Sequence, residues 1–151
     1  MVTLAFWLGI AWAAPPTGQL TIEGVRPARL KAGEAGMVVV EASIRAGFHV
    51  QANPASMPTL IPTKVTLPSA QGIEVGRPVY PKSEDYKIAG LKTAVATYSG
   101  KIEFQVPLTA TSAATPGKKE LDGDIRYQAC DDKVCFPPTR AVFKAPVEIV
   151  R

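Results

Sequence analysis

The sequence has few of the features that mark several large classes of protein. Its 17 Lys and Arg and 13 Asp and Glu residues are scattered along the chain without a block of one sign, so nucleic acid is not an expected partner. After residue 14, no apolar run approaches the roughly 20 residues that a membrane-spanning helix needs. Helical periodicity is not sustained over three turns anywhere, so we expect helix to be a minor component and the mature chain to have no membrane span.

The sequence also lacks the residues of common metal and catalytic sites. Its two cysteines and one histidine, Cys130, Cys135 and His49, are too few for the four ligands of a closed zinc site. Met37, Met57 and His49 could join the two thiolates around Cu(I), but nothing in the sequence brings them together. We find no nucleophilic serine elbow, phosphate-binding glycine loop or convincing carboxylate pair, and we expect neither a metal nor another cofactor.

One apolar segment stands out at the N-terminus. Residues 1–14 carry no charge and end in Ala11-Trp12-Ala13, an A-x-A-type cleavage pattern followed by two prolines. We interpret residues 1–14 as a signal peptide, with an N-terminal core strand as the alternative, because the run is too short for a membrane anchor. Residues 15–151 are then one exported domain with a single hydrophobic core, and in an oxidising compartment its cysteines can stay bonded.

Period-two alternation predicts an all-β fold. Fourteen prolines and twelve glycines divide the chain into short stretches, and the clearest strand, 101–108, alternates apolar and polar residues throughout. Pro107 has no N–H for a ladder, so we expect that end at a sheet edge or strand terminus. The other expected strands are 20–25, 37–44, 48–51, 63–67, 94–98, 121–129 and 141–149. Short strands with regular turn signals and no intervening helices favour an immunoglobulin-like antiparallel β-sandwich of one domain.

Two longer stretches without a strand pattern are candidates for function. Residues 53–62 and 76–92 are longer than most loops of a compact domain, and such loops often carry function. Residues 109–119, rich in Thr, Ala and Ser, are interpreted as a solvated turn. His49 is interpreted either as a residue on the wet face of a strand or as a core imidazole whose hydrogen bonds are satisfied.

The two cysteines are the strongest chemical feature. Cys130 and Cys135 are separated by four residues, and a tight hairpin would bring their Cα atoms within the roughly 4.4–6.8 Å that a disulfide requires. A bridge around such a small loop stabilises a fold by only about 2 kcal/mol. Spacing alone leaves two functions open. The pair either exchanges disulfides with other proteins, or forms an inert bridge in a non-enzymatic envelope domain that binds or assembles.

Residues 127–138, Tyr-Gln-Ala-Cys-Asp-Asp-Lys-Val-Cys-Phe-Pro-Pro, resemble the signature of the N-terminal periplasmic domain of DsbD-type thiol:disulfide interchange proteins. Weaker similarity extends upstream through residues 47–50, 62–63, 79–82 and 98–100. The resemblance implies an immunoglobulin-like, cofactor-free, periplasmic domain. Its cysteine pair relays electrons from a membrane reductase system to thioredoxin-like proteins, among them disulfide isomerases and cytochrome-maturation thioredoxins. We also expect a monomer.

The resemblance further implies a role for each cysteine. Cys135 is the exposed member that exchanges with a partner, and Cys130 resolves the mixed disulfide. Residues 79–86 correspond to a cap loop that shields the pair until a partner docks. The expected shielding and partner-contact residues are Val79, Tyr80, Tyr86, Phe136 and Pro137.

The chain departs from the family in three respects. Some members have five residues between the cysteines, and an aromatic residue at the tip of the cap loop is replaced here by Val79, with Tyr80 as the nearest ring. The membrane and thioredoxin-like domains of full-length members are absent, so we expect a separate electron donor. Asp131 and Asp132 should raise the thiol pKa values and Lys133 should lower them, which predicts a poorly ionised, slowly reacting pair.

Overall fold

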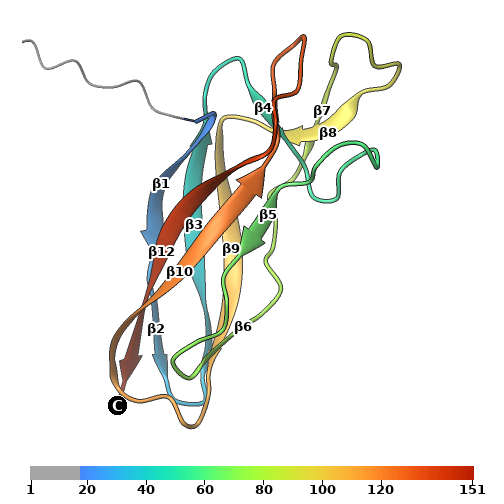
Figure 1. The fold of residues 1–151 in the computed structure, drawn as a ribbon. Helices are drawn as coiled ribbons and strands as arrows, with labels where there is room; N and C mark the ends of the chain where they lie inside the picture. Colours follow the sequence, from blue (N-terminus) through green and yellow to red (C-terminus); the bar gives the residue numbers. More distant parts are fainter. Residues whose placement is uncertain (1–17) are drawn as a thin grey trace, which may run out of the picture.

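A computed structural model describes residues 18–151, which form twelve strands (Figure 1). The strands are β1 (Leu20–Arg26), β2 (Ala28–Lys31), β3 (Ala35–Ile44), β4 (His49–Gln51), β5 (Lys64–Thr66), β6 (Ile73–Val75), β7 (Glu84–Tyr86), β8 (Val95–Tyr98), β9 (Lys101–Ala110), β10 (Gly117–Tyr127), β11 (Ala129–Cys130) and β12 (Thr139–Val150). No helix in this range is long and apolar enough to cross a membrane. The segment 1–14, interpreted as a signal peptide, lies outside the described residues.

Two four-stranded sheets face each other as an immunoglobulin-like sandwich, which confirms the predicted fold class. One sheet has the order β1-β3-β9-β6 and the other β2-β12-β10-β5. The longest ladder joins β10 to β12, from Gly117 opposite Ile149 to Tyr127 opposite Thr139. Every strand pair is antiparallel except β2 and β12, which run parallel along one edge. The C-terminus lies at the end of the sandwich opposite β4, β7 and β8 (Figure 1).

Alternating residues of the long strands form the core between the two sheets. The apolar positions of β9 are buried while Lys101, Glu103 and Gln105 are exposed, and β12 shows the same period. The inward side chains of these two strands are Ile102, Phe104, Val106, Leu108, Phe143, Ala145, Val147 and Ile149. Each large side chain buried in this way contributes about 1.5–3 kcal/mol. The core therefore follows directly from the alternation in the sequence.

The structure differs from the predicted strands where the apolar pattern is short. All eight expected strands are present, although the one expected at 121–129 is divided at residue 128 into β10 and β11. The strands β2, β6 and β7 were not expected, and β7 lies inside the predicted irregular stretch 76–92. The turn predicted at 109–119 is confined to 111–116. β9 continues past Pro107 to Ala110, contrary to expectation. The carbonyl of Pro107 accepts a hydrogen bond from Gly76 N at 2.8 Å, just where the β6 ladder ends, so the missing N–H falls outside that ladder.

A third sheet, which we call the tip sheet, covers one end of the sandwich. Its order is β11-β4-β8-β7, and three of these strands are labelled at the upper end of Figure 1.

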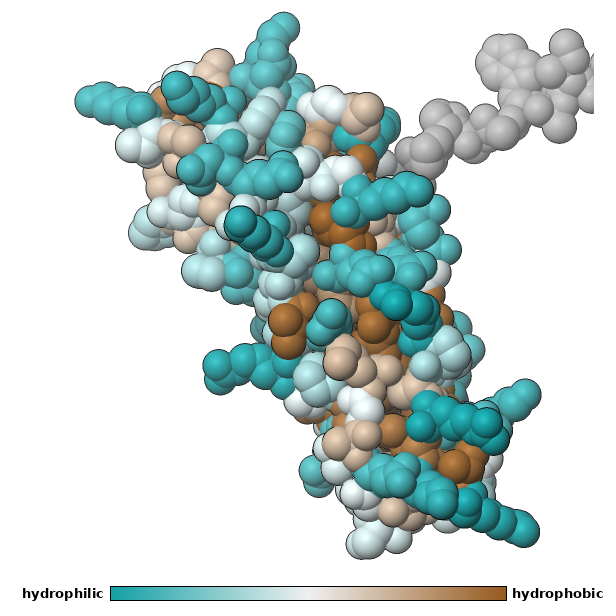
Figure 2. All heavy atoms as spheres, turned by 180° about the vertical axis from the view of Figure 1, so that it is seen from behind, coloured by the Kyte–Doolittle hydropathy of each residue, from teal (hydrophilic) through white to brown (hydrophobic). Residues whose placement is uncertain are grey.

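Seen from behind, the molecular surface is mostly hydrophilic, with hydrophobic residues in small groups (Figure 2).

Candidate redox site at the cysteine hairpin

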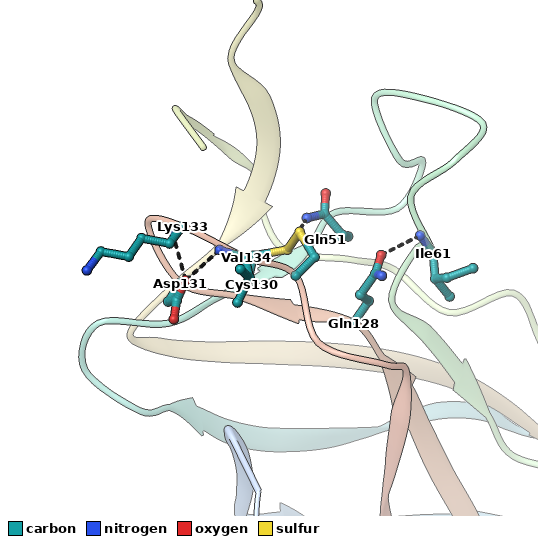
Figure 3. Close-up of a disulfide and its surroundings, with 8 residues drawn as sticks. Gln51, Ile61, Gln128, Cys130, Asp131, Lys133 and Val134 are labelled. Atoms are coloured by element: carbon teal, nitrogen blue, oxygen red, sulfur yellow. Dashed lines mark hydrogen bonds between the residues drawn. A yellow bond between two sulfur atoms is a disulfide. The ribbon is translucent and has the colours of Figure 1, made fainter. Parts of the chain in front are cut away.

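Both cysteines lie in a small hairpin that extends the β10–β12 ribbon beyond the sandwich. Cys130 and Cys135 stand opposite each other and form a disulfide with a Cα–Cα distance of 3.9 Å, slightly shorter than the expected range. The Asp131 Oδ1 atom accepts hydrogen bonds from the N–H groups of Lys133 at 2.8 Å and Val134 at 2.7 Å (Figure 3). These bonds close the turn, so the predicted hairpin is present.

The two faces of the tip sheet have different environments. Val50 on β4 and Ala52 just after it belong to the sandwich core, whereas His49 and Gln51 alternate with them and lie on the other face. His49 stands directly opposite Cys130 in the ladder between β4 and β11. The tip sheet therefore separates the disulfide from the main core, and Cys130 belongs to a second, smaller hydrophobic cluster.

This second cluster, which we call the cysteine cluster, encloses one sulfur more than the other. Its buried residues are Ile88, Val95 and Cys130, and its half-buried residues are Met57, Leu60, Tyr86 and Cys135. Cys130 is 0% exposed, while Cys135 lies at the rim. Both long loops predicted to carry function contribute to it, 53–62 with Met57 and Leu60, and 76–92 with Tyr86 and Ile88. The contribution of the first loop had no specific signal in the sequence.

Hydrogen bonds anchor the covering segments to the hairpin. Ile61 N donates to the Gln128 Oε1 atom at 2.9 Å, and Ala89 N donates to the carbonyl of Asp132 at 3.1 Å (Figure 3 draws the first). Each long loop thus has a direct connection to the chain that carries the cysteines. A movement of the hairpin would therefore strain or break a hydrogen bond to each loop.

Two polar side chains on β4 flank Cys130, and the sequence did not identify either as functional. The Gln51 Nε2 atom donates to the Cys130 Sγ atom at 3.1 Å. The His49 ring stacks on Tyr86 with 3.5 Å between ring centroids. Burial lowers the pKa of His49, and the nearby carboxylate of Glu84 partly opposes that effect. Neither interpretation of His49 was right, because its imidazole is half-buried and its Nδ1 atom has no hydrogen-bond partner.

The turn itself holds one carboxylate in its ionised form. The N–H groups of Val134 and Lys133 lower the pKa of Asp131, because they donate to its charged form. The carboxylate of Asp131 therefore stabilises the turn by accepting these two hydrogen bonds. The predicted influence of Asp131, Asp132 and Lys133 on the thiol pKa values stays a prediction.

The structure divides the five predicted shielding and contact residues into two groups. Tyr86 packs in the cysteine cluster, and Phe136 is half-buried next to Phe48, with exposed Pro137 directly after it. Val79 and Tyr80 instead lie along the sandwich. Val79 pairs with Gln105 of β9, and the Tyr80 hydroxyl accepts a hydrogen bond from Val65 N at 3.1 Å while its ring meets Phe104 edge-on.

The site is suited to thiol–disulfide exchange. Exchange proceeds by attack of a thiolate along the axis of a disulfide, so one sulfur must be reachable and the other must accept the electron pair. Cys135 at the rim and Cys130 in the interior meet these two requirements. Residues 18–151 contain no group of three or more His, Cys, Asp or Glu side chains placed to hold a metal ion.

Comparison with known proteins identifies the family of this architecture. Residues 22–146 match the family described as "Thiol:disulfide interchange protein DsbD, N-terminal". No curated protein matches the chain. Among solved structures, the N-terminal periplasmic domain of ScsB from Proteus mirabilis is similar, with TM-score 0.56 and 15% identity over 89% of this chain and 49% of that one. This chain thus spans about half the length of the ScsB chain.

Two structures from Neisseria meningitidis are similar as well. The complex between the DsbD N-terminal and PilB N-terminal domains gives TM-score 0.51 and 19% identity, over 87% of this chain and 85% of that chain. The reduced DsbD N-terminal domain gives TM-score 0.49 and 19% identity, over 78% and 82%. The likeness to the domains of the complex shows a shared fold.

Proposed function

The chain belongs to the DsbD N-terminal family of thiol:disulfide interchange proteins, and from this premise we propose that it relays electrons in the periplasm. The relay runs through Cys130 and Cys135, from a membrane reductase system to thioredoxin-like proteins, which include proteins of cytochrome maturation. The observation that carries the proposal is the unequal burial of the two sulfurs. Cys130 is fully enclosed and Cys135 lies at the rim.

The unequal burial supports a different role for each cysteine. In the reduced domain, the thiolate of Cys135 attacks the disulfide of an oxidised partner, forms a mixed disulfide and releases one partner thiolate. The sulfur of Cys130 then attacks Cys135, forms the intramolecular disulfide and releases the second partner thiolate. The membrane donor restores the dithiol by the reverse steps. Each step breaks one S–S bond and forms one, so no cofactor is needed.

We further propose that partners dock on the apolar rim around Cys135. Val134 is 52% exposed, and Phe136 and Pro137 follow Cys135 directly. Proline has no N–H, so the stretch after Cys135 offers fewer backbone donors to another strand, which favours a side-chain contact surface. The solved complex of the DsbD and PilB N-terminal domains from Neisseria meningitidis supports a protein domain as the docking partner.

We propose that the cysteine cluster, and not the whole of residues 79–86, covers the disulfide. Tyr86, Ile88, Met57 and Leu60 pack around the sulfurs. Val79 and Tyr80 hold the start of the covering segment on the sandwich. The domain acts as a monomer after export, with residues 1–14 removed as a signal peptide.

Single-cysteine variants test the proposal. Cys130→Ser, reduced and mixed with a thioredoxin variant that keeps one active-site cysteine, activated as a mixed disulfide with an aromatic thiol, should accumulate a covalent complex that dithiothreitol releases, because neither chain keeps a resolving sulfur. Cys135→Ser should form no such complex, since Cys130 is enclosed. The reverse pattern would exchange the two roles. If neither variant forms a complex and both only lower the melting temperature, the disulfide is a structural bridge.

A redox titration separates the same two functions in the unmodified protein. The disulfide should equilibrate with glutathione, whereas structural disulfides resist it and have potentials below about −300 mV. A value below that limit would support the second candidate, an immunoglobulin-like envelope domain with an inert bridge. The low stabilisation expected from a small loop, about 2 kcal/mol, argues against that candidate.

A further inference from the structure

Unpaired polar atoms gather beside Cys130. In residues 18–151, two buried side-chain nitrogen or oxygen atoms have no hydrogen-bond partner, and both lie on β4: His49 Nδ1 and Gln51 Oε1. Buried polar atoms are normally paired, and each exception calls for a physical reason. His49 stands opposite Cys130, and Gln51 follows on the same face. The unpaired atoms therefore flank the enclosed sulfur.

The orientation of the Gln51 amide explains its own unpaired oxygen. A disulfide sulfur carries no hydrogen and can only accept, so the amide turns its NH₂ group toward Cys130 Sγ, at 3.1 Å (Figure 3). The Oε1 atom is then left without a donor. Gln51 is 0% exposed, so water does not reach it easily. Within the described residues, no other hydrogen bond reaches either sulfur of the disulfide.

The backbone holds Gln51 firmly in this position. Its N–H donates to the carbonyl of Gln128 at 3.1 Å, and its carbonyl accepts from the Thr63 hydroxyl at 2.6 Å. A donor fixed before the reaction stabilises a developing charge without the cost of reorganisation. The amide is therefore placed to act on the sulfur during exchange.

We propose that Gln51 is a catalytic residue that stabilises Cys130 as the leaving sulfur, an inference that rests on the proposed function. When a donor thiolate attacks Cys135, a bond forms between the donor sulfur and Cys135 Sγ, and the Cys130–Cys135 bond breaks. The electron pair passes to Cys130 Sγ, where the Gln51 N–H group meets the new thiolate. Hydrogen bonds to charged acceptors are stronger than those to neutral ones, so the contact strengthens as the bond breaks.

The same side chain also fits the protonated state of Cys130. Once the thiolate takes up a proton, its S–H group becomes a donor, and rotation of the Gln51 amide presents Oε1 to it. Gln51 can thus donate a hydrogen bond to the thiolate through Nε2 and accept one from the thiol through Oε1. The disulfide can only accept, so it engages the NH₂ group alone. This accounts for an unpaired oxygen in the oxidised protein.

The test compares Gln51→Met, which keeps the length of the side chain and removes the amide, with the unmodified protein. In a Cys135→Ser background, Cys130 is the single thiol, and its thiolate absorbance is followed against pH. Gln51→Met should raise the pKa of Cys130 by about one unit, a tenfold loss of ionisation. With both cysteines present, reduction by dithiothreitol should slow by about tenfold.

Two further variants keep the test decisive. Gln51→Glu has the same size, and its carboxylate cannot donate, so it should raise the pKa of Cys130 more than Gln51→Met does. Thr97→Val removes the hydroxyl of a buried residue that stands opposite Gln51 on β8, and it should leave the pKa and the rate within twofold. Folding of each variant is checked by circular dichroism.

The outcomes distinguish this inference from the proposed function. If folded Gln51→Met and Gln51→Glu both match the unmodified protein in pKa and rate, Gln51 has no role in exchange, although the relay stands. If the unmodified disulfide itself resists glutathione, the proposed function fails and the inference with it. Equal slowing by Thr97→Val would show a general packing effect and would also overturn the inference.

Discussion

Replacing Tyr86 with alanine should expose the disulfide to small thiols. The ring covers the cysteine cluster and stacks on His49 at 3.5 Å between centroids. It sits on β7, whose ladder to β8 runs only from Glu84 opposite Thr97 to Tyr86 opposite Val95. A short edge strand of this kind opens locally at low free-energy cost. The Tyr86 ring therefore contributes much of the contact that keeps the cysteine cluster closed over the disulfide.

The size of the effect follows from the lost contact. A stacked aromatic pair is worth about 0.5–1.5 kcal/mol beyond its buried area. A loss near the upper end of this range, about 1.4 kcal/mol, raises the open population by about tenfold. If attack follows opening, Tyr86→Ala should speed reduction of the disulfide by dithiothreitol about tenfold. The reaction is stopped with a thiol reagent, and the mass increase is measured against time.

Tyr80→Ala is the matched control for this experiment. Tyr80 meets Phe104 edge-on at 5.9 Å and packs on the sandwich core, not in the cysteine cluster. Its loss should lower the melting temperature and leave the rate of reduction within twofold. Unchanged reduction of Tyr86→Ala would refute a cover formed by the cysteine cluster. Equal acceleration by both variants would show that residues 79–86 shield the site as one loop.

Three other variants test the turn, the half-buried imidazole of His49 and the sandwich. Asp131→Ala should lower the hydrogen-exchange protection factors of the Lys133 and Val134 amides, which donate to the carboxylate. Acid should lower the same protection factors in the unmodified protein as the pH falls below 3.8 toward the lowered pKa of Asp131. Because burial lowers the pKa of His49, the unfolded state takes up a proton first, so stability should fall as pH drops below 6.5. His49→Phe should flatten that dependence in urea titrations at several pH values. Gly123→Ala should lower the free energy of unfolding by about 1–3 kcal/mol, because an added Cβ would lie 2.5 Å from the Phe143 ring.

The long strands and the cysteine hairpin could be predicted because their signals are local. Alternation along β9 and β12 continues for many residues, and each apolar position meets the opposite sheet. The short strands β2, β6 and β7 have too few residues for a period to show. Glu84–Tyr86 forms a strand because β8 offers it a free edge. That edge is a property of the tertiary fold.

The candidate site was predicted only in part, for a related reason. Successive side chains of a strand point to opposite faces, so His49 and Gln51 lie opposite Val50 and Ala52, and such a polar face is usually solvated. Here the segments around Ile88 and Met57 return over that face and enclose it. The sequence shows that two polar residues share a side of a strand. It does not show what later covers them.

The ribbon that carries the cysteines also explains how their spacing can vary within one fold. The β10–β12 ladder keeps one register up to Tyr127 opposite Thr139. Between this pair and the disulfide there are two residues on one strand, 128–129, and three on the other, 136–138. The two segments that connect the ladder to the disulfide therefore differ in length by one residue without changing the register of the ladder. An insertion or deletion between the cysteines would stay outside the ladder, so a family can lengthen or shorten its reactive turn without refolding its scaffold.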